Sequence, residues 1–357
     1  MQRSVTIWIN KSNDLVNTIE QYNSACNECL KWGFENKTYN KSKIHKATYY
    51  QIRATYPKLQ SSLVCASRDQ AADMLKREKC KRFPKKKIHS GIRFNARTIS
   101  ISEDCSRVSL STINGRYKFG ISIPSYFKKY GDGELRAATM SCKNDKIKLV
   151  LSFTFDPVPL TEDSKVLGID RGIINPVVTS DNQFFNSKNL RYVKGKYQYL
   201  RGKLQQKGTR SAIRKLKKLS GKETRFVTDI NHCLSKQLAD SNNGIFVLEN
   251  LTHIRSKNKG KIFNKKIGNW SFSQFSKFLE YKAEDRGKSV LYVDPKYTSQ
   301  KCSVCGHIEK SNRVKSNFAC KRCNFSLNAD LNAARNIAQL GISLLSRLPV
   351  NQPIVTL

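Results

Sequence analysis

Four cysteines near the C-terminal end of the chain constrain its fold more than any other feature. They form two Cys-x-x-Cys pairs, Cys302 with Cys305 and Cys320 with Cys323, separated by fourteen residues. Each pair presents two sulfur atoms to one ion, and the intervening loop lets the pairs face each other, as in a structural Zn²⁺ site. The loop is one residue shorter than is usual for zinc ribbons, but Gly306 gives the first pair freedom to turn. The spacing favours a closed zinc site over four reduced core cysteines.

Three acidic residues at the ends of expected elements are the candidate catalytic groups. Asp170 and Glu249 each end a short apolar stretch that is typical of a buried strand. Asp330 lies in the first turn of an expected helix, soon after the second cysteine pair. A single acid at a strand end is most often a solvated cap, whereas three carboxylates held together repel one another and need a cation. We therefore expect them to bind one or two Mg²⁺ ions, with Mn²⁺ as an alternative.

Four motifs that contain these residues resemble those of the TnpB family, which are transposon-encoded, RNA-guided nucleases related to the type V CRISPR effectors. The motifs occur in the family's order and the similarity covers residues 165–345; before residue 165 it extends to the general layout alone. They are Gly168-Ile-Asp170-Arg-Gly172, Leu248-Glu249-Asn-Leu251, Tyr297-Thr-Ser-Gln-Lys-Cys302-Ser-Val-Cys305-Gly306 and Ala329-Asp330-Leu-Asn-Ala-Ala334.

The resemblance implies a role for each acid. In the family the three acids form the catalytic triad of a RuvC-like, RNase H-fold nuclease, so this role falls on Asp170, Glu249 and Asp330. Two departures are visible: Asn250 stands where an Asp often follows the Glu, and Asn324 where a Gly often follows the last cysteine. Neither change removes a zinc ligand or a triad acid, so we expect an intact nuclease.

The overall charge indicates a polyanionic partner. The chain carries 65 Lys and Arg against 27 Asp and Glu, a net charge of +38 with a pI of about 10.0. Such self-repulsion is typical of proteins that bind nucleic acid. The absence of a long apolar run and of a signal peptide argues against a membrane or secreted protein. Eleven cysteines, an odd number, favour a reducing compartment: the cytoplasm, with nucleoid association, in a prokaryote, or the nucleus in a eukaryotic or viral relative.

Three basic segments are candidates for contact with nucleic acid. Segment 188–225 contains fourteen Lys and Arg and one acid, and its leucines predict a helical pair broken near Gly208. Segment 76–87 packs eight basic residues into twelve and alternatively reads as a nuclear localisation run. Segment 255–266 is expected to be a loop. The predicted phosphate contacts all lie in the first segment: Lys194, Lys196, Arg201, Lys203, Arg210, Arg214, Lys215, Lys217 and Lys218.

The order of expected elements predicts an α+β, multidomain protein. A lone strand at 4–9, helices from about 14 to 77 and further strands from 92 to 155 suggest a β-barrel with a helical insertion. The resemblance implies that these are a wedge barrel and a recognition insertion, followed by a RuvC-like nuclease with an inserted zinc ribbon. The expected boundaries are 1–10 and 86–158 for the barrel, 11–85 for the helical insertion, 165–300 for the nuclease including the basic helices 188–225, 301–325 for the ribbon, 326–345 for the last nuclease helix and 346–357 for a tail.

These features together predict a function. We expect an RNA-guided, metal-dependent DNA endonuclease of a mobile element, which binds a transposon-derived guide RNA and hydrolyses phosphodiesters of complementary DNA beside a short adjacent motif. Two alternatives remain: a nuclease-silent RNA-guided DNA-binding repressor, and a transposase accessory protein or RNA-independent nuclease. The sequence does not distinguish a monomer from a dimer.

Overall fold

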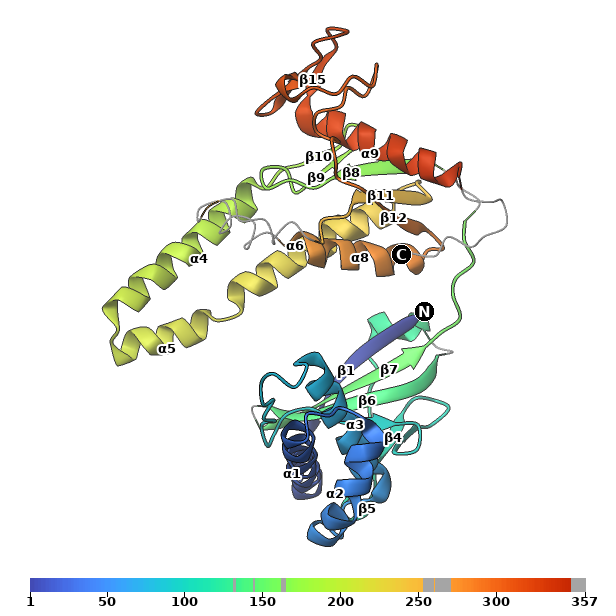
Figure 1. The fold of residues 1–357 in the computed structure, drawn as a ribbon, viewed down its shortest axis with the longest axis vertical. Helices are drawn as coiled ribbons and strands as arrows, with labels where there is room; N and C mark the ends of the chain where they lie inside the picture. Colours follow the sequence, from blue (N-terminus) through green and yellow to red (C-terminus); the bar gives the residue numbers. More distant parts are fainter. Residues whose placement is uncertain (131–132, 144, 162–164, 253–259, 261–270, 348–357) are drawn as a thin grey trace. The chain divides into compact units, whose positions relative to one another are not determined.

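A computed structural model describes residues 1–130, 133–143, 145–161, 165–252, 260 and 271–347 (Figure 1). The chain forms two compact units, Met1–Asp156 and Pro157–Leu357. The third basic segment, 255–266, lies outside the described residues except for Gly260, and so does most of the expected tail.

The first unit contains two antiparallel sheets. The larger sheet has the strand order β1-β7-β6-β2, in which the first strand of the chain pairs along its whole length with β7. Alternate residues of β7, from Ile147 to Phe153, are buried, as the alternating sequence predicts. The strands are β1 (Gln2–Asn10), β2 (Ile92–Asn95), β6 (Glu134–Lys143) and β7 (Lys146–Thr154), and the smaller sheet has β3 (Ile99–Ile101), β4 (Arg107–Thr112) and β5 (Gly115–Gly120).

Three helices are inserted between β1 and β2, and they pack mainly on one another. They are α1 (Asn13–Glu35), α2 (Lys41–Thr55) and α3 (Ser61–Arg77), and a 3₁₀ turn, η1 (Ser125–Tyr130), follows β5. In the sequence, Leu15, Ile19, Tyr22, Cys26 and Cys29 lie at helical spacing, which predicts an apolar face on α1, and all five are fully buried. Burial raises the pKa of Cys26 to about 12, so the cysteine pair is a packing feature and not a thiolate site.

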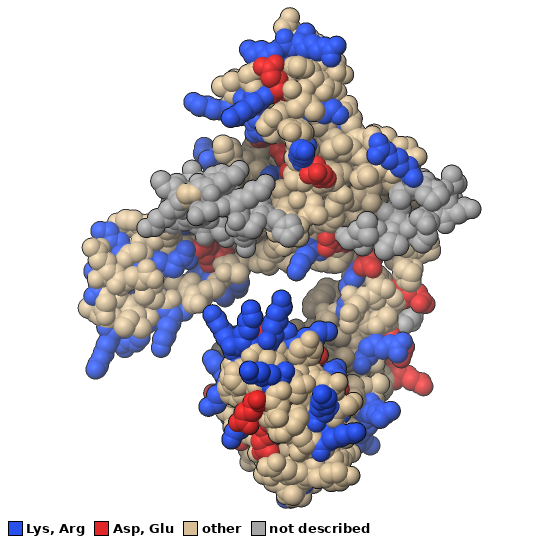
Figure 2. Space-filling model, viewed as in Figure 1, with Lys and Arg blue, Asp and Glu red and all other residues tan. Residues whose placement is uncertain are grey.

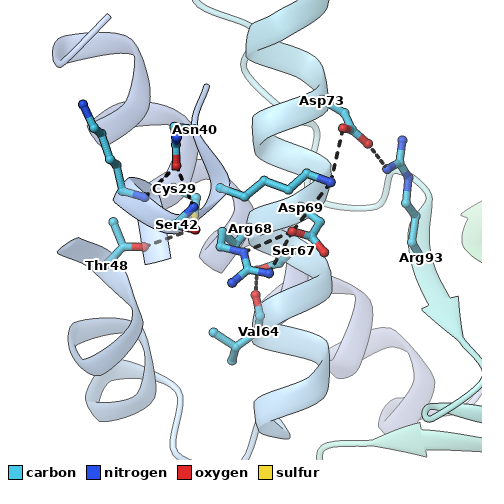
Figure 3. Close-up of polar contacts among 12 residues, drawn as sticks. Cys29, Asn40, Ser42, Thr48, Val64, Ser67, Arg68, Asp69, Asp73 and Arg93 are labelled. Atoms are coloured by element: carbon cyan, nitrogen blue, oxygen red, sulfur yellow. Dashed lines mark hydrogen bonds and ion pairs between the residues drawn. The ribbon is translucent and has the colours of Figure 1, made fainter. Parts of the chain in front are cut away.

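Polar contacts fix the ends and the outer face of these helices (Figure 3). The Asn40 side chain caps α2 by accepting from the N–H groups of Ser42 and Lys43. On α3, Asp73 accepts from the Arg93 guanidinium of β2 at 2.6 Å. The helical insertion is therefore joined to the larger sheet by an ion pair as well as by its core. The expected strand-rich part with inserted helices is present, with its described strands in two sheets.

The second unit is built on a five-stranded mixed sheet in the order β10-β9-β8-β11-β12. The three strands β8, β11 and β12 are parallel, with Leu248 beside Ile169 and Glu249 beside Val293. Parallel strands end at the same edge of a sheet, so the acids that end β8 and β11 lie at one edge. The strands are β8 (Val166–Asp170), β9 (Val177–Thr179), β10 (Phe184–Phe185), β11 (Ile245–Glu249) and β12 (Ser289–Val293).

Helices cover both faces of this sheet, with α9 (Ala329–Leu345) on one face and α6 (Lys222–Ala239) and α8 (Phe272–Glu284) on the other (Figure 1). Helix α9 approaches β8 closely because Gly168 has no side chain: a Cβ there would lie 2.1 Å from the Ala334 carbonyl oxygen. The helical spacing of the apolar residues in α9 predicts that Ile342 faces the sheet, and this prediction is wrong, since Ile342 is 53% exposed. Gly341 occupies the contact with Val247 instead and turns Ile342 outward.

The basic segment forms the expected helical pair, α4 (Lys188–Lys207) and α5 (Arg210–Leu219), which extends beyond the sheet (Figure 1). Gly208 ends α4 with a φ of +61°, a conformation that favours glycine. No residue of α4 is buried, because the pair packs mostly on itself. Its leucines are therefore only half-buried. Along the described residues, no helix combines the length and the apolar character needed to cross a bilayer.

Between β12 and α9 the chain forms a small three-stranded sheet, and the second cysteine pair lies in the loop between its last two strands. Its elements are η2 (Lys310–Asn312), β13 (Arg313–Val314), β14 (Asn317–Ala319) and β15 (Ser326–Asn328), in the order β13-β14-β15. Phe318 and two of the cysteines form its core. So small a sheet buries too little apolar surface to be stable alone.

Candidate active site and metal centre

The structure brings the three predicted acids together at one edge of the main sheet. Asp170 and Glu249 are the last residues of β8 and β11, and Asp330 is the second residue of α9. Asn328 caps α9 by accepting from the Asp330 N–H at 2.9 Å, which aims the first turn of the helix at the strand ends. Burial, followed by the charges of Glu249 and Asp330, raises the pKa of Asp170 to about 7.

Three neutral or cationic groups orient these carboxylates. The Asn175 side chain donates to Asp330 Oδ2 at 3.1 Å, and Arg313 Nη2 donates to its Oδ1 at 3.0 Å. The Thr298 hydroxyl donates to Glu249 Oε1. Burial raises the pKa of Glu249, and the Thr298 hydrogen bond opposes that rise. Both oxygens of Asp330 and one of Glu249 are therefore held in place.

These orienting residues were not predicted from the sequence, although two of them lie in or beside a motif. Thr298 lies within the Tyr297 motif, and Asn175 closes the turn that follows the Asp170 motif, where it accepts from the Gly172 N–H at 2.9 Å. A Cβ on Gly172 would lie 2.7 Å from that carbonyl oxygen, so the turn requires glycine. No sequence pattern marks Arg313, because it reaches Asp330 only after the ribbon has folded.

The carboxylate cluster fits a hard divalent cation. Its donors are oxygens. Burial, and then repulsion by Glu249 and Asp330, raises the pKa of Asp170, and a bound cation relieves both effects. Within the described part of the chain, the three acids do not bring one oxygen each within 4.8 Å of one another. Acids that bridge two ions about 4 Å apart span a wider site than the ligands of one ion.

The four predicted cysteines form a compact cluster that can hold one metal ion. Their Sγ atoms all lie within 4.8 Å of one another, with Cys302 to Cys323 at 3.7 Å and Cys305 to Cys320 at 3.6 Å. Sulfur atoms about 2.3 Å from a tetrahedral ion lie roughly 3.8 Å apart. The geometry fits the closed, all-thiolate site that zinc prefers.

The two halves of this cluster have the same backbone turn. Gly306 and Asn324 each follow the second cysteine of a pair, with φ values of +75° and +57°. Each donates its N–H to the first cysteine's carbonyl oxygen at 3.0 Å. Asn is tolerated in this left-handed conformation, so the change noted at Asn324 keeps the turn. His307 contacts Glu309 at 3.1 Å and is not among the clustered ligands.

Side-chain amides join the cysteine cluster to helix α9. Asn332 accepts from the Ser303 N–H at 3.0 Å and donates to the Lys301 carbonyl at 2.8 Å. Asn336 donates to the Thr298 and Lys301 carbonyls at 2.9 and 2.7 Å. Both asparagines are buried. The helix that carries Asp330 is thus bonded directly to the first cysteine pair and to the segment that carries Thr298.

The predicted nucleic-acid residues all lie on the two exposed basic helices, whose cationic surface is visible in Figure 2. Arg201 pairs with Glu223, and burial lowers the pKa of Lys194. In the second basic segment Lys86 is buried, with its Nζ donating to Gln70 at 2.7 Å. That segment is therefore not a uniform cationic surface. The α4 residues are Lys194, Lys196, Arg201 and Lys203, and the α5 residues are Arg210, Arg214, Lys215, Lys217 and Lys218.

We expect Asp170→Asn to stabilise the Mg²⁺-free protein at pH 8. The pKa of Asp170 is about 7 against an ordinary 3.8, so folding takes up a proton and the free energy of unfolding falls as the pH rises through this window. Each unit is worth about 1.4 kcal/mol. Since the side chain is only half-buried by area, we expect a gain of about 1–3 kcal/mol at pH 8 and little near pH 4.

Urea unfolding of both zinc-loaded proteins without added Mg²⁺ at the two pH values measures this gain. An equal effect at both values would mean that an altered hydrogen bond, and not the charge of Asp170, explains the change. Saturating Mg²⁺ is the control, because it stabilises the native acid more than the amide and narrows the difference.

Two family models match the chain. A model described as a probable transposase, OrfB_IS605, matches residues 144–256, and one described as the Cas12f1-like TNB domain matches residues 272–337. Together they include all three acids and all four cysteines. The chain therefore resembles transposon-related proteins and CRISPR-associated proteins.

Curated relatives give the comparison more detail. A CRISPR-associated endodeoxyribonuclease Cas12f1 of Sulfoacidibacillus thermotolerans is 30% identical over 55% of this chain and 50% of its own length. A TnpB-like protein of Methanocaldococcus jannaschii is 27% identical over 59% of this chain and 81% of its own. The putative RNA-guided DNA endonuclease InsQ of Escherichia coli is 25% identical over 81% of this chain and 75% of its own length. The match to the Cas12f1 protein spans about half of that protein's length. The resemblance to the TnpB family is confirmed.

Proposed function

We propose that this chain is an RNA-guided, metal-dependent DNA endonuclease of a mobile element. The observation that carries the proposal is the convergence of Asp170, Glu249 and Asp330 at one sheet edge, with the pKa of Asp170 raised to about 7. A structural cluster gains nothing from three half-buried acids that repel one another. The relatives' names support the same activity, since they include an endodeoxyribonuclease and a putative RNA-guided DNA endonuclease.

The acids would act by holding Mg²⁺. The ion would stabilise the attacking and leaving oxygens of a phosphodiester during hydrolysis. Asn175 and Thr298 fix which oxygens of Asp330 and Glu249 face the site. Arg313 places a cation at Asp330, where it offsets negative charge brought in by a phosphate. Zinc would occupy the four-cysteine site as a structural ion.

Guide RNA and target DNA are the proposed partners. Base pairing would select the target, while the protein would hold the heteroduplex by its charge and shape and read a short adjacent motif. The net charge of +38 and the exposed α4–α5 pair suit this role. Residues 1–158 would form the wedge barrel with its recognition insertion, and residues 165–345 the RuvC-like nuclease with the ribbon. A nuclease-silent repressor and an RNA-independent nuclease are less well supported, because all three acids are present beside a large cationic surface.

Neutralising α5 tests the cationic surface. We expect the quadruple change of Arg214, Lys215, Lys217 and Lys218 to Gln to weaken nucleic-acid binding. The plot of log affinity against log salt should become shallower by about 0.7–0.9 for each phosphate that the variant no longer neutralises. Filter binding across a salt series measures the slope. The selected target should stay the same, since phosphate contacts carry no sequence information; a changed target would assign base reading to α5.

A guide exchange tests the proposed function itself. Purified protein receives its transposon-end RNA with one of two guides, and both matching DNA targets are offered with Mg²⁺. Cleavage should move with the guide and cease after the RNA is digested. Identical cleavage with both guides would favour the RNA-independent nuclease, and guide-dependent binding without cleavage would favour the repressor.

A further inference from the structure

A cavity beside the carboxylate cluster carries polar groups that the proposed cleavage does not use. It has a volume of about 380 Å³ and lies between the ends of β8 and β11 and the first turns of α8. Arg171, which follows Asp170, and Asn250, which follows Glu249, both line it. The residues that directly follow two of the three acids therefore line the cavity at the same sheet edge.

Arg171 is the main group in this cavity and it has no anionic partner among its hydrogen bonds. It is only 6% exposed. One guanidinium nitrogen donates to the Glu249 backbone carbonyl and another to the Ser276 hydroxyl. Its Nε has no acceptor among the described residues. A buried guanidinium with a donor left over is costly, and an anion in the cavity would remove that cost.

The N-terminus of α8 contributes a second positive feature. The N-cap residue, Ser271, makes no side-chain capping bond. The next two residues, Phe272 and Ser273, belong to the first turn of this thirteen-residue helix and line the cavity. The Ser273 backbone N–H has no intrahelical partner at the start of the helix, and the N-terminal end of a helix attracts anions. Lys277, one turn further along the same helix face, also lines the cavity.

The described residues that line the cavity carry one excess positive charge. Arg171 and Lys277 provide two cations, and Glu280 provides one carboxylate. That carboxylate already accepts from the Tyr292 hydroxyl. Asp170 and Glu249, the acids proposed to hold the metal ion, also attract Arg171. A phosphodiester carries a single negative charge and several acceptor oxygens, which suits a guanidinium Nε and backbone N–H groups.

We propose that this cavity binds a backbone phosphodiester of the DNA strand that enters the carboxylate cluster, beside the phosphate that is cut. This assignment rests on the proposed nuclease function. Because Arg171 and Asn250 are chain neighbours of Asp170 and Glu249, a phosphate held here fixes the register of the strand at the site. Arg171 would join the two sites, since it also holds the backbone of Glu249.

The test observes the Arg171 Nε–H directly. The zinc-loaded full chain is titrated without added Mg²⁺ with the dinucleotide TpT, which has one phosphodiester, while ¹H–¹⁵N correlation spectra follow the arginine side-chain signals. The Arg171 signal, assigned with Arg171→Lys, should move downfield and saturate. A matched ligand with a neutral methylphosphonate should leave it in place. Loss of a hydrogen bond to a charged group costs roughly tenfold or more in affinity, so Lys277→Gln should raise the half-saturation concentration about tenfold.

A lysine variant outside the cavity serves as the control for Lys277→Gln. Lys236→Gln removes one exposed cation from α6 outside the cavity, and it should leave the half-saturation concentration within about twofold, since screened charges at a distance matter little. The proposal fails if the signal does not move, if both dinucleotides move it alike, or if both lysine variants weaken binding equally. Tighter saturation by inorganic phosphate than by TpT would assign the cavity to free phosphate. Failure of guide-directed cleavage would reject the nuclease function without altering this titration.

Discussion

Asp170→Ala, Glu249→Ala and Asp330→Ala should each lower the rate of Mg²⁺-dependent DNA cleavage by about 10³-fold or more. Each change removes a carboxylate from the converging cluster, and the several kcal/mol that a bound ion contributes to the transition state correspond to a loss of this size. Nucleic-acid binding should change little, because its affinity comes from distant cationic surfaces. Single-turnover cleavage and filter binding with the same RNA and DNA measure the two effects separately.

Asp240→Ala is the matched control for these three variants. Asp240 is an acid of the same unit that pairs with Arg286, away from the cluster. Its loss should leave the cleavage rate within about threefold, as expected for an exposed ion pair. Near-native cleavage in any one of the three variants would remove that residue from the site. Loss of binding in parallel with cleavage would instead indicate a folding defect.

The sequence was sufficient for those parts of the site that short-range patterns determine. The cysteine spacing predicted a cluster whose four Sγ atoms do come within 4.8 Å. The apolar stretches before Asp170 and Glu249 predicted strands, and the parallel pairing of β8 with β11 explains why both acids share one edge. Helical spacing predicted the α4–α5 pair and its break at Gly208.

Contacts between distant segments could not be predicted in the same way. Arg313 meets Asp330 only because β13 folds back toward α9, and no periodicity in the sequence marks that approach. Lys86 is one of eight basic residues in its segment, yet it is buried against Tyr22 and Gln70. The closure of the described N-terminal strands into two sheets likewise depends on pairings such as β1 with β7, which lie far apart in the chain. Charge and spacing alone do not encode which face of a segment is covered.

Removing the metal from the four-cysteine site should abolish cleavage as well as unfold the ribbon. The ribbon's own sheet is too small to be stable alone, and structural zinc contributes about 10–16 kcal/mol to the folding of comparable peptides. Arg313 reaches Asp330 from β13, and Asn332 and Asn336 bond α9 to the Lys301 carbonyl, directly before Cys302. A disordered ribbon would therefore remove the Arg313 hydrogen bond from Asp330. We expect Cys320→Ser to lower bound zinc well below one ion per chain and cleavage by about 100-fold or more, since removing one zinc ligand costs several kcal/mol.

Metal analysis, thiol titration and cleavage of the same preparations test this coupling. Cys233→Ser is the matched control, because Cys233 is an exposed thiol of the same unit outside the cluster, and it should keep both zinc and activity. Native protein with far less than one zinc per chain and four freely titratable thiols would contradict the site. Loss of zinc with full cleavage would separate the ribbon from the active site, and the Arg313 contact would then be structural only. The contact pattern argues for coupling, because the same helix carries Asp330 at its start and the two ribbon-binding asparagines in its next turns.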